Sequence, residues 1–286
     1  MLYVIELVTR PFQYEFMQHA LFAGILAAIL SSLVGFFVVI RQLGFAAHAL
    51  GHVAFAGATG ATLLGFSPMA GQLVITLITG IVMGSLGRRL QEKDTIIGIA
   101  LALALGLGVL FLHFYRTYSG QANSILWGDL LGVSSAALNS MMVFTVVGVI
   151  LLALLARPLW FASLSPALAE AKRLPISLIS TLFFCIMALA ITLASQVVGV
   201  LLVFTLVIGP PAIALQWTHR FWSGISASCF LGILIVWMAL LFAYYTDWPI
   251  SFWISVEVFG LYLLGGLKDK WRWNQSAIVH TDNLKI

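Results

Sequence analysis

The chain has 286 residues, of which 62% are hydrophobic and only 8% are charged, and its mean hydropathy is +1.07. Soluble domains carry about 25% charged residues, so this composition excludes the soluble classes of protein. The net charge of +4 comes without a basic patch interleaved with aromatic residues, and nucleic acid is therefore not an expected partner. The sequence also lacks a G-x-x-x-x-G-K-[ST] phosphate loop, so the chain does not hydrolyse ATP by that route.

Nine apolar stretches are long enough to cross a bilayer, which takes about 20 residues. They cover residues 19–40, 43–65, 69–87, 95–115, 136–156, 176–195, 197–216, 221–245 and 250–267. Long runs of this kind, without alternating ten-residue stretches, predict an all-α polytopic transmembrane helical bundle with no soluble domain. The second and third stretches are short and rich in glycine and either can instead re-enter the membrane, so the sequence predicts eight or nine spans.

The spans divide the chain into three parts. We expect residues 1–18 to lie at the lipid interface. Residues 19–267 are expected to form the transmembrane domain, and residues 268–286 a polar cytoplasmic tail. With the N-terminus outside, only Arg10 and Arg116 among the basic residues of the loops fall outside, which satisfies the positive-inside rule. We therefore expect a multi-pass protein of the plasma membrane, the inner membrane of a bacterium, with its C-terminus in the cytoplasm.

Two histidines lie four residues apart in the second apolar stretch. On a helix, this spacing puts the imidazoles of His48 and His52 on one face, with their Cβ atoms about 6 Å apart. Imidazole is a favoured ligand of zinc and neighbouring metals, and ionisable groups at membrane depth commonly mark a transport pathway. The pair therefore predicts transient metal ligands; the alternative is two neutral imidazoles that are hydrogen-bonded within the bundle.

A proline pair interrupts the seventh stretch. Pro210 and Pro211 follow Gly209 and remove two backbone donors, which frees the carbonyls near Leu206 and Val207. We expect a kink or break here, either as a purely structural feature or as a moving element of a transport pathway.

The connection of residues 157–175 on the cytoplasmic side contains its own helix signals. Ser165 is suited to the N-cap and Pro166 to the first helical position, while Pro175 favours an end near Leu174. The expected short helix, Pro166 to Arg173, has a shape suited to docking on a partner protein. Its charged residues are Glu170, Lys172 and Arg173.

Two acidic residues are weaker candidates. Glu257 lies within the last span, where an acid either pairs with another helix or lines a polar cavity. Asp129 lies in the long external connection of residues 117–135 and serves either a local cap or the entrance for a metal ion. Cys185 and Cys229 lie in apolar spans and predict reduced, packed thiols.

Two local patterns predict helix starts and contacts. Asp94 is expected in the first turn of the fourth span, where a carboxylate is favoured by the helix dipole. Gly80-x-x-x-Gly84 has the small-xxx-small form that lets membrane helices approach closely.

Five segments in order resemble the membrane permeases of zinc/manganese-type ABC importers over residues 19–267. The matching segments are RQLGFAAHALGH (Arg41–His52), DTIIGI (Asp94–Ile99), WGDLLGVS (Trp127–Ser134), Ser165–Pro175, and Val198–Ala212 with its GPPA end. The resemblance implies an importer that works by alternating access as a homodimer. It also implies an extracytoplasmic metal-binding protein and a separate ATPase subunit that holds the ATP and docks near Pro166–Arg173.

At position 52 this chain has the histidine that the family motif has. At position 48 it has histidine where the family usually has aspartate. Imidazole in place of a carboxylate favours Zn²⁺ over Mn²⁺ as the transported ion, although Mn²⁺ stays open. The alternatives from the sequence are a self-sufficient ion-coupled carrier, a permease for an organic metal chelate, and a membrane anchor that transports nothing.

Overall fold

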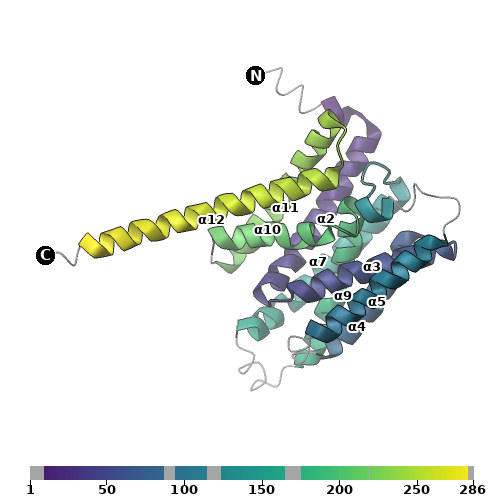
Figure 1. The fold of residues 1–286 in the computed structure, drawn as a ribbon, viewed down its shortest axis with the longest axis horizontal. Coiled ribbons are helices and arrows are strands. Elements are labelled where there is room, and N and C mark those ends of the chain that lie inside the picture. Colours follow the sequence, from purple (N-terminus) through teal and green to yellow (C-terminus); the bar gives the residue numbers. More distant parts are fainter. Residues whose placement is uncertain (1–9, 87–93, 115–123, 165–174, 219, 283–286) are drawn as a thin grey trace.

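The computed structural model describes residues 10–86, 94–114, 124–164, 175–218 and 220–282, and the side chains of these residues except 164 and 267–282. The described residues form helices and no strand, as expected for an all-α membrane protein (Figure 1). In chain order these are η1 (Arg10–Gln13), α2 (Glu15–Ile40), α3 (Gly44–Leu63), α4 (Pro68–Leu86), α5 (Asp94–His113), α7 (Ser135–Leu164), α9 (Ile176–Val198), α10 (Val203–Trp217), α11 (Phe221–Thr246) and α12 (Ile250–Asp282).

Each of the nine apolar stretches coincides with one helix of the described chain, from α2 to α12. Six of these helices are long and apolar enough to cross a membrane, namely α2, α4, α5, α7, α9 and α11. α10 and the Ile250–Gly266 part of α12 are shorter apolar helices, and α12 continues beyond the bundle toward the C-terminus (Figure 1). The membrane-helix class is confirmed, whereas the number of crossings stays a prediction.

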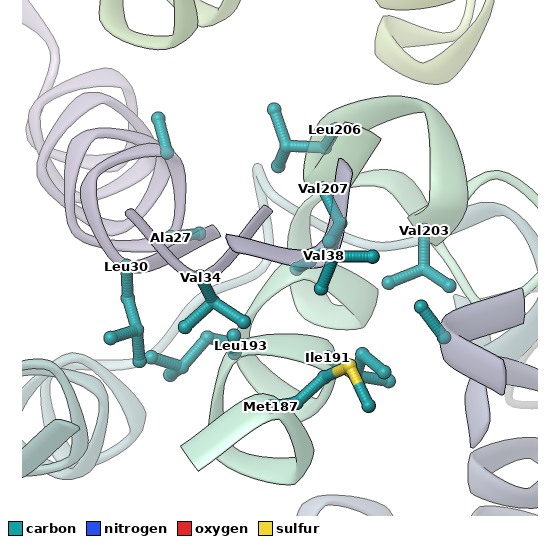
Figure 2. Packing of buried hydrophobic residues seen from close by; sticks show 14 of the residues in the cluster. Ala27, Leu30, Val34, Val38, Met187, Ile191, Leu193, Val203, Leu206 and Val207 are labelled. Atoms are coloured by element: carbon teal, nitrogen blue, oxygen red, sulfur yellow. The ribbon is translucent and has the colours of Figure 1, made fainter. Parts of the chain in front are cut away.

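The centre of the bundle is formed by α2, α9 and α10. Small residues recur along α2 every three or four positions, so that its neighbours approach closely. A Cβ atom added at Gly35 would meet the carbonyl oxygen of Val207 on α10, which shows how near the two backbones lie. Larger side chains fill the remaining space (Figure 2). They include Leu30, Val34 and Val38 of α2, Met187, Ile191 and Leu193 of α9, and Val203, Leu206 and Val207 of α10.

Beside this core, α3, α4 and α5 form a second group that joins it through α9 (Figure 1). The expected contact of Gly80 and Gly84 is confirmed, since added Cβ atoms there would meet the backbone of α9 at Phe184 and Thr181. Asp94 is the first residue of α5, as predicted.

Of the kink or break expected at the proline pair, the break is absent. α10 continues through Pro210 and Pro211, and the chain instead leaves helical geometry at residues 199–202, where Gly199 has a φ of +77°. The glycine, and not the prolines, interrupts the path because only glycine adopts a positive φ without cost. The carbonyl that Pro211 leaves without a donor, that of Val207, faces the bare Cα of Gly35.

The helix α7 also extends further than expected. It passes through Pro158 and ends at Leu164, so residues 157–164 belong to a helix and not to the predicted connection. Packing explains the extension, because Leu159 is fully buried and the ring of Trp160 lies 4.3 Å from that of Phe221. The rest of the predicted coupling segment, including Ser165, Pro166, Glu170, Lys172 and Arg173, lies outside the described residues.

Candidate functional site

The two histidines meet as the spacing predicts. The Nε2 atoms of His48 and His52 lie 3.2 Å apart, and the two rings stand nearly perpendicular, with an interplanar angle of 89°. Both side chains are half-buried, and the Nδ1 atom of His52 is enclosed without a hydrogen-bond partner among the described residues. The pair is therefore desolvated on one side and accessible on the other.

The accessible side of α3 is a single narrow line. Between Phe45 and Gly60 most side chains of α3 are buried, and those that are not follow each other at intervals of three or four residues. This α3 stripe consists of Phe45, His48, His52, Ala56 and Gly60. A helix has 3.6 residues per turn, so the stripe runs straight along one face of α3, and the histidines are its polar members.

The separation of the two nitrogens suits one shared metal ion. Two ligands of a tetrahedral zinc ion at about 2.0–2.1 Å from the metal lie about 3.3 Å from each other. The observed 3.2 Å matches that edge, although a hydrogen bond between the imidazoles gives a similar separation. No third histidine, cysteine, aspartate or glutamate of the described ranges joins the pair, so one copy of the chain supplies two ligands to such an ion.

Beside the stripe lies the first turn of α10. The ring of Phe204 stands edge-on to that of His48, with 5.3 Å between the ring centroids and an interplanar angle of 82°. Ile208, one turn further along α10, approaches the start of α3 at Gly44. The exposed faces of α3 and α10 thus adjoin, and an aromatic ring of α10 lies against one of the two imidazoles.

The predicted hinge residues do not reach the histidines. Pro210 and Pro211 are buried, Pro211 lies against α2 at Gly35, and Gly209 contacts Val258 of α12. These contacts hold α10 in the bundle, further along the helix than Phe204.

Asp129 and Glu257 also lie apart from the histidine pair. Asp129 is exposed, and its carboxylate accepts a hydrogen bond from the backbone amide of Gly132 at 3.0 Å. It borders two cavities at the end of the bundle where α9 stops, of about 550 and 180 Å³. Glu257 is half-buried on α12, and its Oε1 atom makes no hydrogen bond to any described residue.

A polar cluster between α4 and α9 was not anticipated from the sequence. The Oε1 atom of Gln72 accepts hydrogen bonds from the hydroxyl of Ser195 at 2.8 Å and from the side-chain amide of Gln196 at 3.0 Å. Polar residues in apolar spans can be noticed in the sequence, but only the structure shows that these three side chains meet. Phe204 carries no sequence signal of this kind, because an apolar residue in a span is ordinary.

Known proteins share both the sequence pattern and the fold. The manganese transport system membrane protein MntC of Halalkalibacterium halodurans is 29% identical over 72% of this chain and 71% of its own length. The manganese import system permease protein ScaB of Streptococcus parasanguinis is 27% identical, covering 84% of this chain and 86% of ScaB. A chain of PsaBC from Streptococcus pneumoniae, solved in complex with Fab, has the same fold, with a TM-score of 0.82, 23% identity, and coverage of 92% and 95%.

The family model fits nearly all of the bundle. Residues 13–268 match it, a range that begins before α2 and ends within α12 and so includes the histidine pair. The chain belongs to the ABC 3 transport family.

Proposed function

We propose that this chain is the membrane-spanning permease subunit of an ATP-driven metal-ion importer. The observation that carries the proposal is the α3 stripe, which presents two imidazoles 3.2 Å apart on the single accessible line of an otherwise buried helix. Ionisable groups that face lipid are costly, so this line is expected to face a water-accessible route or another protein surface. Family membership supports a transport role over that of a passive anchor.

A second copy of the chain is the proposed partner across this face. The histidine pair supplies two nitrogen ligands, and a two-fold axis beside the α3 stripe would bring two more. Four imidazoles satisfy a tetrahedral ion. During transport the four need not bind together, because a site that opens on alternate sides of the membrane has to release its ion.

Zinc is the favoured cargo. MntC and ScaB are named for manganese, a harder ion that prefers carboxylate and other oxygen ligands. In this chain the two side chains that meet are both imidazoles, which suit zinc. We therefore infer that the transporter moves Zn²⁺ in preference to Mn²⁺.

The ATPase and the extracytoplasmic metal-binding protein are expected on opposite ends of the bundle. The charged segment that includes Lys172 and Arg173 connects α7 to α9, and the start of α9 lies beside the end of α2, where Arg41 donates a hydrogen bond to Ser180. We propose that this end faces the cytoplasm and the ATPase. The opposite end, which includes Asp129, then faces the binding protein.

The test is uptake of radioactive zinc by the complete complex in cells or vesicles. We expect the double variant His48→Ala, His52→Ala to reduce uptake to background, whereas His113→Ala, at the exposed end of α5, leaves uptake unchanged. Normal uptake by a correctly assembled double variant would remove the pair from the mechanism. Uptake by this chain alone, without an ATPase, would instead establish the ion-coupled carrier.

A further inference from the structure

One aromatic side chain contacts the ring of His48 from a different helix. Phe204 stands in the first turn of α10, and its ring meets that of His48 in an edge-to-face arrangement at 5.3 Å. Aromatic pairs prefer this geometry and gain about 0.5–1.5 kcal/mol from it beyond the burial of area. In the same arrangement the Nε2 atom of His48 points to that of His52. His48 thus contacts Phe204 with its ring and His52 with its Nε2 atom at the same time.

The place of Phe204 depends in turn on the interruption between α9 and α10. Five residues before Phe204, Gly199 has a φ of +77° and ends α9. The backbone on either side of it is bonded to a distant part of the chain: the amide of Val200 donates to the carbonyl of Ile125 at 3.2 Å, and the amide of Asp129 donates to the carbonyl of Gln196 at 3.3 Å. Residues 125–129 thus hold residues 196–200 at two points.

Two glycines make this contact close enough for such bonds. A Cβ atom added at Gly128 would lie 2.7 Å from the amide nitrogen of Gly199 and 2.6 Å from the carbonyl oxygen of Val197. A Cβ atom added at Gly199 would meet the backbone of Leu126 and Gly128. Both glycines also have a positive φ, +80° and +77°. We call residues 125–129 and 196–200 together the glycine clasp.

We propose that Phe204 is the positioning residue for His48, and that the glycine clasp sets where Phe204 stands. The inference rests on the proposed function, since it concerns the same metal site. It assigns a role to a residue that binds no metal itself. Loss of the phenyl ring frees His48 to adopt other rotamers, so its nitrogen faces His52 for less of the time and metal affinity falls.

The test is the affinity of the purified complex for Zn²⁺, measured by competition with a zinc-sensitive dye. We expect Phe204→Ala to weaken binding about threefold to tenfold, which corresponds to the loss of one aromatic pair. Phe204→Tyr keeps the ring edge and should restore most of the affinity. A role in stability alone would not produce this recovery at equal complex yield, because the dye reports the site and not the amount of folded protein.

Gly199→Ala tests the second half of the proposal. The added methyl group would disrupt the clasp, so we expect zinc affinity to fall in the same direction as for Phe204→Ala. Gly65→Ala is the matched control: Gly65 has the same unusual backbone, with a φ of +81°, but nothing lies within 4 Å of its added Cβ atom. We expect Gly65→Ala to leave zinc affinity unchanged.

The outcomes separate this inference from the proposed function. If the double variant His48→Ala, His52→Ala binds zinc like wild type, the proposed function fails. If that variant loses zinc but Phe204→Ala keeps wild-type affinity, only the positioning role fails. A normal affinity in Gly199→Ala, or an equal loss in Gly65→Ala, would overturn the role of the clasp.

Discussion

The helices α3 and α5 have equal lengths of 20 residues, lie in contact, and have opposite surfaces. α3 is buried on all sides except one stripe, whereas α5 is exposed on most sides and buried along a line at Ile97, Ala104 and Gly108. Ile99 and Leu103 of α5 are 67% and 64% exposed. α5 has the surface of a helix that faces lipid, and α3 that of a helix that packs against protein on all but one narrow face.

Hydropathy identifies α5 as a membrane span but does not identify α3, the helix that contains the histidine pair. α5 qualifies as a span with a mean hydropathy of 2.6, while α3 does not reach the group of candidate spans in the described chain. The reason is physical. Large apolar side chains are favoured where a helix faces lipid, whereas a helix that packs closely on several others is rich in alanine and glycine, and the two histidines of α3 lower its hydropathy further. The helix that we propose to carry the metal site is thus one that hydropathy alone does not mark as a membrane span.

Among the substitutions that test the different packing of α3 and α5, we expect the largest effect on stability. Gly57→Ala on α3 places a methyl group 2.5 Å from the carbonyl oxygen of Gly71 on α4, so the two helices have to separate. We expect a cost of about 1–3 kcal/mol, which is typical of overpacking. Thermal unfolding of the detergent-solubilised complex measures it.

The matched control is Gly106→Ala on α5, where nothing lies within 4 Å of the added Cβ atom. This change should be neutral or stabilise the helix by less than about 1 kcal/mol, since alanine is the better helix former. Equal unfolding temperatures for the two variants would contradict the assignment of α3 as the packed helix and α5 as the free one.

The next effect is on the choice of metal. His48→Asp replaces an imidazole of the α3 stripe with a carboxylate, which is the residue that the resemblance leads one to expect at this position. A carboxylate suits Mn²⁺ better than an imidazole does, so the ratio of manganese to zinc uptake should rise several-fold. His48→Asn, which has a similar size and no charge, is the control. An unchanged ratio in His48→Asp would show that His48 does not select the ion.

The helices and the histidine contact show which features could be predicted from the sequence. Most boundaries of the long helices were predicted to within a few residues, because apolar runs of about 20 residues are a strong signal. The exceptions are the start of α10 and the C-terminal ends of α7 and α12. The meeting of His48 and His52 was equally predictable, since it depends on the geometry of one helix.

What the sequence did not predict depends on contacts between distant segments. Proline is the stronger local signal, so a kink or break was expected at Pro210 and Pro211, whereas the helical path is interrupted at residues 199–202, where Gly128 and Gly199 meet. α7 continues through Pro158 because Trp160 packs on Phe221. Phe204 beside His48 likewise joins two helices about 150 residues apart in the chain. In each case tertiary packing overrides or adds to the local pattern.

A smaller effect concerns access to water. In a chain whose Cys185 and Cys229 are replaced by serine, Ala56→Cys on the α3 stripe and Ala102→Cys on the exposed side of α5 differ only in position. A thiol reacts as the thiolate, which needs water, so a hydrophilic methanethiosulfonate reagent should label the first and not the second. An unlabelled Ala56→Cys would mean that the stripe does not line an aqueous route, and labelling of both would mean that the two helices do not differ in their access to water.

The smallest effect is expected at Glu257, and it separates the two transport mechanisms. Glu257→Gln keeps the size of a side chain whose Oε1 atom has no hydrogen-bond partner among the described residues, so packing of α12 should change little. In an ABC importer the energy comes from ATP on another subunit, and zinc uptake by the complete complex should stay close to that of wild type. An ion-coupled carrier instead needs an acidic residue at membrane depth to carry the coupling proton, and Glu257→Gln would then abolish uptake. A loss of uptake by a correctly assembled Glu257→Gln complex would therefore favour the carrier, whereas unchanged uptake would remove Glu257 as a coupling group and favour the ATP-driven importer.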